Sequence, residues 1–109
     1  MKKTPAERSR LTDHQFHLIA KALADPRRMQ VLEVIAGERA CPCQRLTQEF
    51  PVSKATISHH IKELVRAGLI EARREGQYLS CEVRRDVLDA YTSELRRRAG
   101  LKGPASAGL

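Results

Sequence analysis

Residues 53–66 read SKATISHHIKELVR, and this segment restricts the possible folds more than any other part of the chain. Its apolar residues recur at helical spacing and form one stripe, made of Ile57, Ile61, Leu64 and Val65. Ser53 is a favoured residue for capping a helix N-terminus, and Gly68 is a favoured residue for ending a helix. The segment therefore predicts an amphipathic helix whose exposed face carries small, polar and charged side chains.

Two helices are predicted near the start of the chain. Thr12 and Gln15 have the spacing of a capping box, which predicts a helix start at this point. The apolar residues that follow at helical spacing are Phe16, Ile19, Ala20 and Leu23. Asp25-Pro26 is typical of a second helix start, and Gly37 is its natural stop. The expected buried stripe of this second helix is Met29, Leu32 and Ile35.

A third, short helix is expected to begin at Cys41-Pro42 and to end before Pro51. Together with the helix at 53–66 it gives the order short helix, brief break, longer helix. This order is the helix-turn-helix arrangement.

A hairpin and a last helix are predicted after Gly68. Residues 69–74 and 77–83 read as two strands, because apolar and polar residues alternate in the second and a Gly-containing turn joins the two. Residues 85–98 return to helical spacing. The predicted class is mainly α (α+β), a winged helix-turn-helix with the order α-α-α-α-β-β-α. It is expected to form one domain at 12–98, between flexible segments at 1–11 and 99–109.

Charge and composition narrow the function. The 109 residues include 20 Lys and Arg against 13 Asp and Glu, which gives a net charge of +7 and favours polyanionic partners. Two Phe, two Tyr and no Trp disfavour a protein that stacks single-stranded bases. We find no phosphate-binding loop or catalytic motif, so an enzyme is not expected. The absence of a long apolar run and of a secretory signal predicts no membrane association and a cytoplasmic location.

The polar face of the 53–66 helix is the predicted surface for double-stranded DNA. Residues near the start of a recognition helix reach base edges, so the candidates there are Lys54, Thr56, Ser58 and His59. Lys62 lies further along and is expected to contact phosphate. The hairpin adds Arg73, Arg74 and Gln77. The alternative is an ordinary amphipathic helix with a solvated face. It is weakened because the basic charge, the helix spacing and a basic hairpin coincide.

Cys41 and Cys43 are the residues that could make the protein a sensor. If Pro42 is the first helical residue, both thiols lie at a helix N-terminus, where the helix dipole favours thiolates that bind soft metals. The alternatives are that they undergo oxidation, or that they are small residues at the helix start with no ligand at all. Cys81 alternates with Leu79 and Val83 toward the core and is expected to be structural.

The runs ALADPRRMQVLEVI and SKATISHHIKELVRAGLIEARREGQYLSCEV resemble the ArsR/SmtB family of bacterial winged-helix repressors, over roughly residues 12–98. The resemblance implies a homodimer on a palindromic operator, released by an inducer. It also implies a dimer interface made by the first and last helices. On this chain the matching apolar residues are Phe16, Ile19, Leu23, Leu88, Tyr91 and Leu95.

The resemblance also bears on the inducer. Thiol-sensing members carry Cys-x-Cys-x-x-Cys in the third helix, but Leu46 stands here at the third position, so an As(III) site would lack one local ligand. His14 and His17 could complete a Zn(II) or Cd(II) site from the other subunit. A second metal site known in the family needs histidines on the last helix, and residues 85–98 contain none. The prediction is a repressor released by a metal, metalloid or oxidant. The alternative is a DNA-binding regulator with no input at the cysteines.

Overall fold

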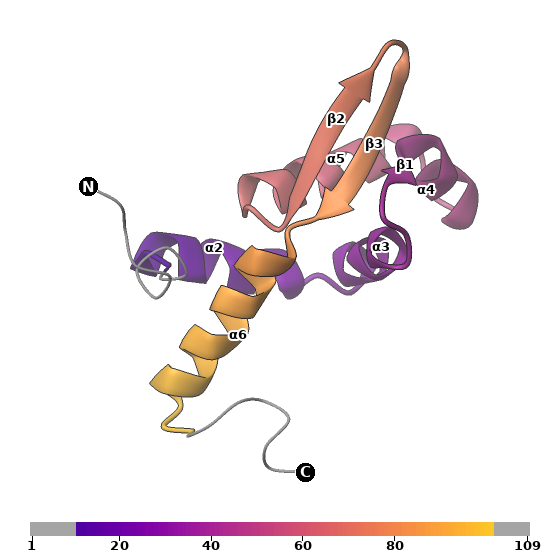
Figure 1. Ribbon diagram of the computed structural model, residues 1–109. Coiled ribbons are helices and arrows are strands. Elements are labelled where there is room, and N and C mark those ends of the chain that lie inside the picture. The colour runs from indigo at the N-terminus through magenta and orange to yellow at the C-terminus, as the bar shows by residue number, and fades with distance from the viewer. Residues whose placement is uncertain (1–10, 102–109) are drawn as a thin grey trace.

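A computed structural model describes residues 11–101 of the chain. The segments expected to be flexible, 1–11 and 99–109, lie largely outside this range. Only residue 11 and residues 99–101 of these segments are described. The elements are α2 (Asp13–Leu23), α3 (Pro26–Ala36), β1 (Cys41–Pro42), α4 (Cys43–Glu49), α5 (Lys54–Arg66), β2 (Ile70–Glu75), β3 (Tyr78–Val83) and α6 (Arg85–Arg98). In Figure 1 the β2–β3 hairpin projects to one side of the helices, and α6 runs away from it on the other.

Three helices begin at the caps that the sequence predicts. The backbone N–H of Gln15 donates to the Thr12 hydroxyl at 3.0 Å, which starts α2. The Asp25 carboxylate accepts from the N–H of Arg28 at 3.0 Å, with Pro26 in the first turn of α3. Ser53 caps α5 in the same way. Each cap satisfies a backbone donor that has no partner inside its own helix, so each fixes where the helix starts.

The core lies between α2, α3, α5 and the sheet. Its largest fully buried side chains include Ile19, Val31, Ile35, Leu46, Ile57, Leu64 and Leu69. Two predicted core residues are not buried: Met29 is 36% exposed and Val65 is 41% exposed. In α3 the fully buried Val31 takes the position expected of Met29, because packing against α2, α5 and β3 sets which face of α3 turns inward. In α5 the exposure of Val65 leaves a narrower apolar stripe than predicted.

The sheet has three antiparallel strands in the order β1-β3-β2, so the predicted order α-α-α-α-β-β-α lacks one short strand. Cys41 pairs with Cys81 and Pro42 pairs with Ser80, which makes residues 41–42 a strand and not a helix start. Glu75 pairs with Tyr78, so the hairpin turn is Gly76-Gln77 and lies one residue later than expected. Gly76 has φ +64°, a backbone conformation that glycine adopts without strain.

Gly68 turns the chain from α5 into β2. Its φ is +81°, its N–H donates to the carbonyl of Val65, and the N–H of Leu69 donates to the carbonyl of Leu64. These two bonds form a Schellman motif, which satisfies the last carbonyls of the helix. A Cβ at this position would lie 3.0 Å from Nε2 of the Gln15 side chain. Gly68 therefore fixes how α5 is joined to the hairpin.

Candidate nucleic-acid interface

The polar face of α5 is exposed along its length. All five candidate contacts on this helix are exposed: Lys54, Thr56, Ser58, His59 and Lys62. The opposite face is buried and consists of Ile57, His60, Ile61 and Leu64. The helix is thus anchored by its buried face, and its polar face stays accessible to a partner.

The start of α5 is organised by two hydroxyl groups. The Ser53 Oγ accepts from the N–H of Thr56 at 3.1 Å and also lies 3.0 Å from the Thr56 Oγ1. The Thr56 side chain is therefore held against the helix start, while no such bond ties down Lys54 or Ser58 within the described range. Free backbone N–H groups and the helix dipole make this end attractive to phosphate.

The hairpin supplies the second part of the surface. Arg73, Arg74 and Gln77 are exposed, as predicted, and Arg73 lies 3.6 Å from the Glu71 carboxylate. Tyr78 was not predicted to take part, yet it is 66% exposed at the tip of the hairpin. The alternation with Leu79 and Cys81 already places Tyr78 on the outward face of its strand. That alternation was the signal available in the sequence.

A groove of about 540 Å³ separates α5 from the hairpin. It brings Lys54, Ser58 and Lys62 of the predicted set together with Gln77, and it adds Tyr78. The groove lining leaves out Thr56, His59, Arg73 and Arg74. Polar groups from the helix and the hairpin therefore face one hollow on the same side of the molecule.

His60 is separated from this surface although it is adjacent to His59. It is buried, and its Nδ1 has no hydrogen-bond partner among the described residues. Burial lowers the pKa of His60, which the nearby Asp25 carboxylate opposes only in part, so the ring is neutral at pH 7. His60 is therefore a packing residue behind the exposed face of α5.

The cysteine prediction needs correction. Cys41 lies in β1 and not at a helix N-terminus, and its side chain is completely buried in the core. Burial raises the pKa of the Cys41 thiol, which is the opposite of the thiolate expected there. Only Cys43 lies at the start of α4, where it is half-buried and lines the groove.

Cys43 has a partner that sequence reasoning missed. Its sulfur lies 3.1 Å from the sulfur of Cys81, which is buried in β3 as predicted. Hydrogen bonding from the Cys81 thiol lowers the pKa of Cys43, and the same bond together with burial raises the pKa of Cys81. The sequence could not reveal this pair, because it depends on β1 adding to the sheet beside β3.

The described part of one chain does not contain a complete metal site. Across residues 11–101 no group of three His, Cys, Asp or Glu side chains is placed to hold a metal ion. His14 and His17 lie on α2, and the imidazole of His17 is 3.7 Å from the Asp13 carboxylate. The two thiols of Cys43 and Cys81 are too few ligands for a closed zinc site.

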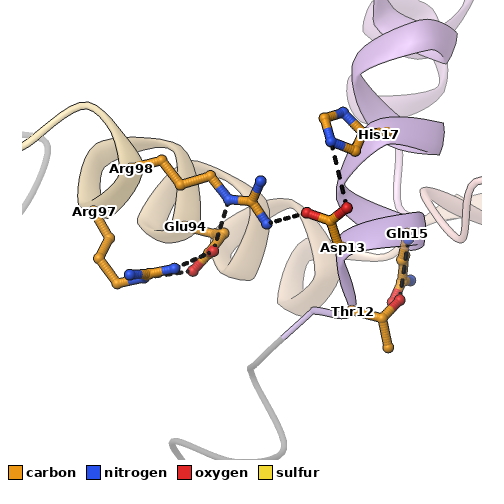
Figure 2. Close-up of polar contacts among 7 residues, drawn as sticks. All are labelled: Thr12, Asp13, Gln15, His17, Glu94, Arg97 and Arg98. Atoms are coloured by element: carbon orange, nitrogen blue, oxygen red, sulfur yellow. Dashed lines mark hydrogen bonds and ion pairs between the residues drawn. The ribbon is translucent and has the colours of Figure 1, made fainter.

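The predicted dimer surface is built on a close contact between α2 and α6. The ring of Phe16 packs against Tyr91 with centroids 5.1 Å apart, and the guanidinium of Arg98 lies 4.0 Å from the centre of the same ring. Arg98 bonds to Asp13 at 3.0 Å and to Glu94 at 2.8 Å, and Figure 2 shows this bridge between the two helices. The contact fixes the position of α6 on α2.

The six predicted interface residues differ in exposure. Ile19 is completely buried within this chain, so it can only support such a surface from beneath. Phe16 is also buried, while Leu23, Leu88 and Tyr91 are half-buried. Leu95 is 46% exposed. The apolar side chains left accessible on these helices lie along α6 and at the end of α2.

These features define a winged helix-turn-helix protein with a basic, exposed recognition surface. Residues 23–73 match a family model described as a helix-turn-helix domain. The arsenical resistance operon repressor of Staphylococcus xylosus is 32% identical over 81 residues, which cover 74% of this chain and 77% of that relative. The chain belongs to the ArsR family of winged helix-turn-helix transcriptional regulators.

Solved structures agree with this fold. An ArsR-like transcriptional regulator from Rhodococcus sp. RHA1 matches with a TM-score of 0.73 at 22% identity, over 80% of this chain and 81% of that one. A homodimeric winged helix-turn-helix DNA-binding domain from Mycobacterium bovis matches with a TM-score of 0.64 at 25% identity, over 84% and 92% of the two chains. The protein is thus a DNA-binding transcriptional repressor of a non-enzymatic family. No helix within residues 11–101 is long and apolar enough to cross a membrane.

Proposed function

We propose that this repressor binds a palindromic operator in the cytoplasm as a homodimer, with α5 of each protomer in the major groove. The observation that carries the proposal is the groove shared by α5 and the hairpin, where Lys54, Ser58 and Lys62 face Gln77. Lys54, Thr56, Ser58 and His59 then reach base edges or the groove wall. Lys62 contacts phosphate, and Arg73 and Arg74 follow the neighbouring backbone or minor groove.

A fluorescence anisotropy titration tests the DNA-binding part. The probe is a labelled duplex from the region upstream of the protein's own gene, with a scrambled duplex of the same composition as control. We expect tighter binding to the upstream duplex, with affinity that falls steeply as salt rises, because bound phosphates release counterions. Equal affinity for the two duplexes at every salt concentration would overturn the proposal.

The homodimer is supported by the apolar side chains that α6 leaves accessible. Leu88 and Tyr91 are half-buried and Leu95 is exposed on α6, which packs on α2. A second copy of the same face can cover them, and the structural relative from Mycobacterium bovis is homodimeric. Sedimentation equilibrium checks this, and Leu95→Glu is expected to shift the protein toward monomer. A monomer in wild type at micromolar concentration contradicts the dimer.

Release from the operator is proposed to depend on a thiol-reactive signal, either an oxidant or a soft ion such as As(III), Zn(II) or Cd(II). The support is Cys43, which lines the groove and has a lowered pKa. Cys41 was predicted to share this role, but it is buried with a raised pKa. The burial of Cys41 favours a second candidate, a regulator with no input at its cysteines.

The same titration separates these two candidates. Each metal, As(III) and hydrogen peroxide is added to the protein–operator complex, for wild type and for the double variant Cys41→Ser/Cys43→Ser. A response that only wild type shows supports the sensor. If both proteins respond identically to every addition, the regulator without cysteine input is correct.

A further inference from the structure

Cys43 and Cys81 lie at the junction between the helix-turn-helix and the hairpin. Cys43 is the first residue of α4, Cys81 lies within the central strand β3, and their sulfur atoms are 3.1 Å apart. A disulfide has an S–S distance of about 2.05 Å, so the sulfur atoms need to approach by only about 1 Å. The fold therefore holds two thiols ready to be joined.

The third cysteine does not compete for this bond. Cys41 pairs with Cys81 along the sheet, but its thiol is directed to the carbonyl of Pro42, at 3.7 Å. Cys41 is also completely buried, which keeps oxidants away from its sulfur. A disulfide from Cys41 would require its side chain to leave the core.

The two partners differ in access, which assigns their roles. Cys43 is half-buried and lines the groove beside Lys62 and Gln77, whereas Cys81 is completely covered. The thiolate form is the nucleophile in thiol oxidation, and the hydrogen bond donated by Cys81 stabilises a thiolate on Cys43. Cys43 is therefore the sulfur that meets an oxidant, and Cys81 is the sulfur that completes the bond.

We propose that Cys43 and Cys81 are a redox pair that closes to an intramolecular disulfide when a peroxide enters the groove, and that closure changes operator affinity. The second part of this proposal rests on the proposed function. The thiolate of Cys43 attacks one peroxide oxygen and becomes a sulfenic acid, and the other oxygen leaves as water after taking a proton. The Cys81 sulfur then attacks the sulfenic sulfur, the S–S bond forms, and a second water is released. Two thiols are oxidised and one peroxide is reduced.

Closure affects the surface that faces DNA. The pair joins α4 to β3. α4 precedes α5 in the helix-turn-helix, and β3 is one strand of the hairpin. Cys43 shares the groove lining with Lys54, Ser58 and Lys62 of α5. Drawing α4 toward β3 changes the groove where these side chains meet Gln77. Operator affinity is thus expected to differ between the dithiol and disulfide states.

Peptide mapping tests the bond itself, independently of DNA. Trypsin cuts after Arg39, Arg45, Arg74 and Arg84, which places Cys41 and Cys43 together in residues 40–45 and Cys81 in residues 75–84. After peroxide treatment and alkylation of free thiols, we expect these two peptides to be cross-linked and to separate on reduction. A disulfide inside peptide 40–45, a bond between chains, or three free thiols would each overturn the pair.

Single variants decide which thiol of peptide 40–45 is bonded. Cys41→Ser is the matched control and is expected to keep the cross-link, whereas Cys43→Ser is expected to lose it. Cys43 is only half-buried, so Cys43→Ser should fold, and circular dichroism checks this. Cys81→Ala is the second variant and should lose the cross-link too. A cross-link that survives in Cys43→Ser refutes the assignment.

Anisotropy with the operator duplex tests the regulatory step. We expect oxidation to weaken binding by roughly tenfold, a typical size for coupling between two sites, in wild type and Cys41→Ser but not in Cys43→Ser. A mapped disulfide with unchanged operator affinity would refute the regulatory step. A protein that binds no operator in either state would instead refute the proposed function and leave the mapped disulfide standing.

Discussion

α5 and α6 both carry basic side chains, but the two helices place them in different surroundings. On α6, Arg97 and Arg98 bond to Glu94, and Arg98 also reaches Asp13 of α2. On α5, Lys54 and Lys62 are exposed and form no ion pair with any residue in the described range. A guanidinium already paired within the protein has less to gain from a phosphate. Local neutralisation, and not the number of basic residues, therefore separates the ion-paired arginines of α6 from the exposed lysines of α5, which are proposed to face DNA.

The largest expected effect is a loss of stability when the contact between α2 and α6 is disrupted. Phe16→Ala removes a buried ring, 7% exposed, that contacts both Tyr91 and Arg98. The free energy of unfolding should fall by about 3 kcal/mol, because the lost contacts leave a cavity. Urea denaturation followed by circular dichroism measures this loss. The control is Tyr78→Ala, an exposed aromatic on the hairpin, and a similar loss in both variants would contradict a central role for Phe16.

Charge reversal compares the two basic clusters directly. Lys62→Glu is expected to weaken operator binding on the order of 30-fold and to reduce its salt dependence, because each protomer loses a phosphate contact and gains a repulsion. Arg97→Glu makes the same change in charge on α6 and should alter affinity less than about threefold. Anisotropy at several salt concentrations measures both. Equal losses would mean that net charge alone drives binding.

A smaller effect is expected for His59 on the exposed face of α5, and it tests whether this residue contacts bases or phosphate. His59→Ala should weaken operator binding roughly fivefold and should lower the preference for operator over scrambled duplex, since base contacts carry sequence information. His14→Ala removes another exposed imidazole on α2 and is the matched control. Competition between the two duplexes gives the ratio of affinities. A weaker but equally selective His59→Ala protein would assign this residue to phosphate contact.

The smallest expected effect is the pH-dependent stabilisation of the fold by the bonds of Arg97 and Arg98 to Glu94. Hydrogen bonds from Arg97 and Arg98 lower the pKa of Glu94 from 4.5 to about 2. A carboxylate with a lowered pKa stabilises the folded state above its unfolded pKa, and this stabilisation is lost as pH falls through 4.5 toward 2. The difference in Tm between wild type and Glu94→Gln should therefore be small but present at neutral pH and should shrink over that range. A difference that is constant with pH would show that the Glu94 charge is not involved.

Features set by neighbouring residues could be predicted from the sequence. The caps at Thr12, Asp25 and Ser53 each involve a backbone group three residues away, so their pattern is visible in the letters alone. The exposed face of α5 also followed from helical spacing. The hairpin was found because strand alternation and a glycine lie close together in sequence.

Features that depend on distant residues could not be predicted. The strand at Cys41-Pro42 is two residues long, too short for any periodicity, and exists because β3 offers hydrogen-bonding partners. The thiol contact of Cys43 with Cys81 follows from that pairing. Likewise, the sequence shows three arginines at the end of α6. It does not show that Arg98 bonds to Asp13, a residue far away in the sequence. The DNA contacts of α5 and the hairpin remain predictions.

β1 ties the entry to α4 onto the same sheet that forms the hairpin. Because of this strand, the helix-turn-helix and the hairpin of one protomer cannot easily swing apart. In the proposed dimer, a change at the α2–α6 contact would then reach DNA as a rotation of each protomer as a unit. Such a rotation alters the separation of the two α5 helices, which must match half-sites about 34 Å apart. In the proposed dimer, operator affinity is therefore expected to depend on the spacing of the two α5 helices as well as on the shape of the groove within each protomer.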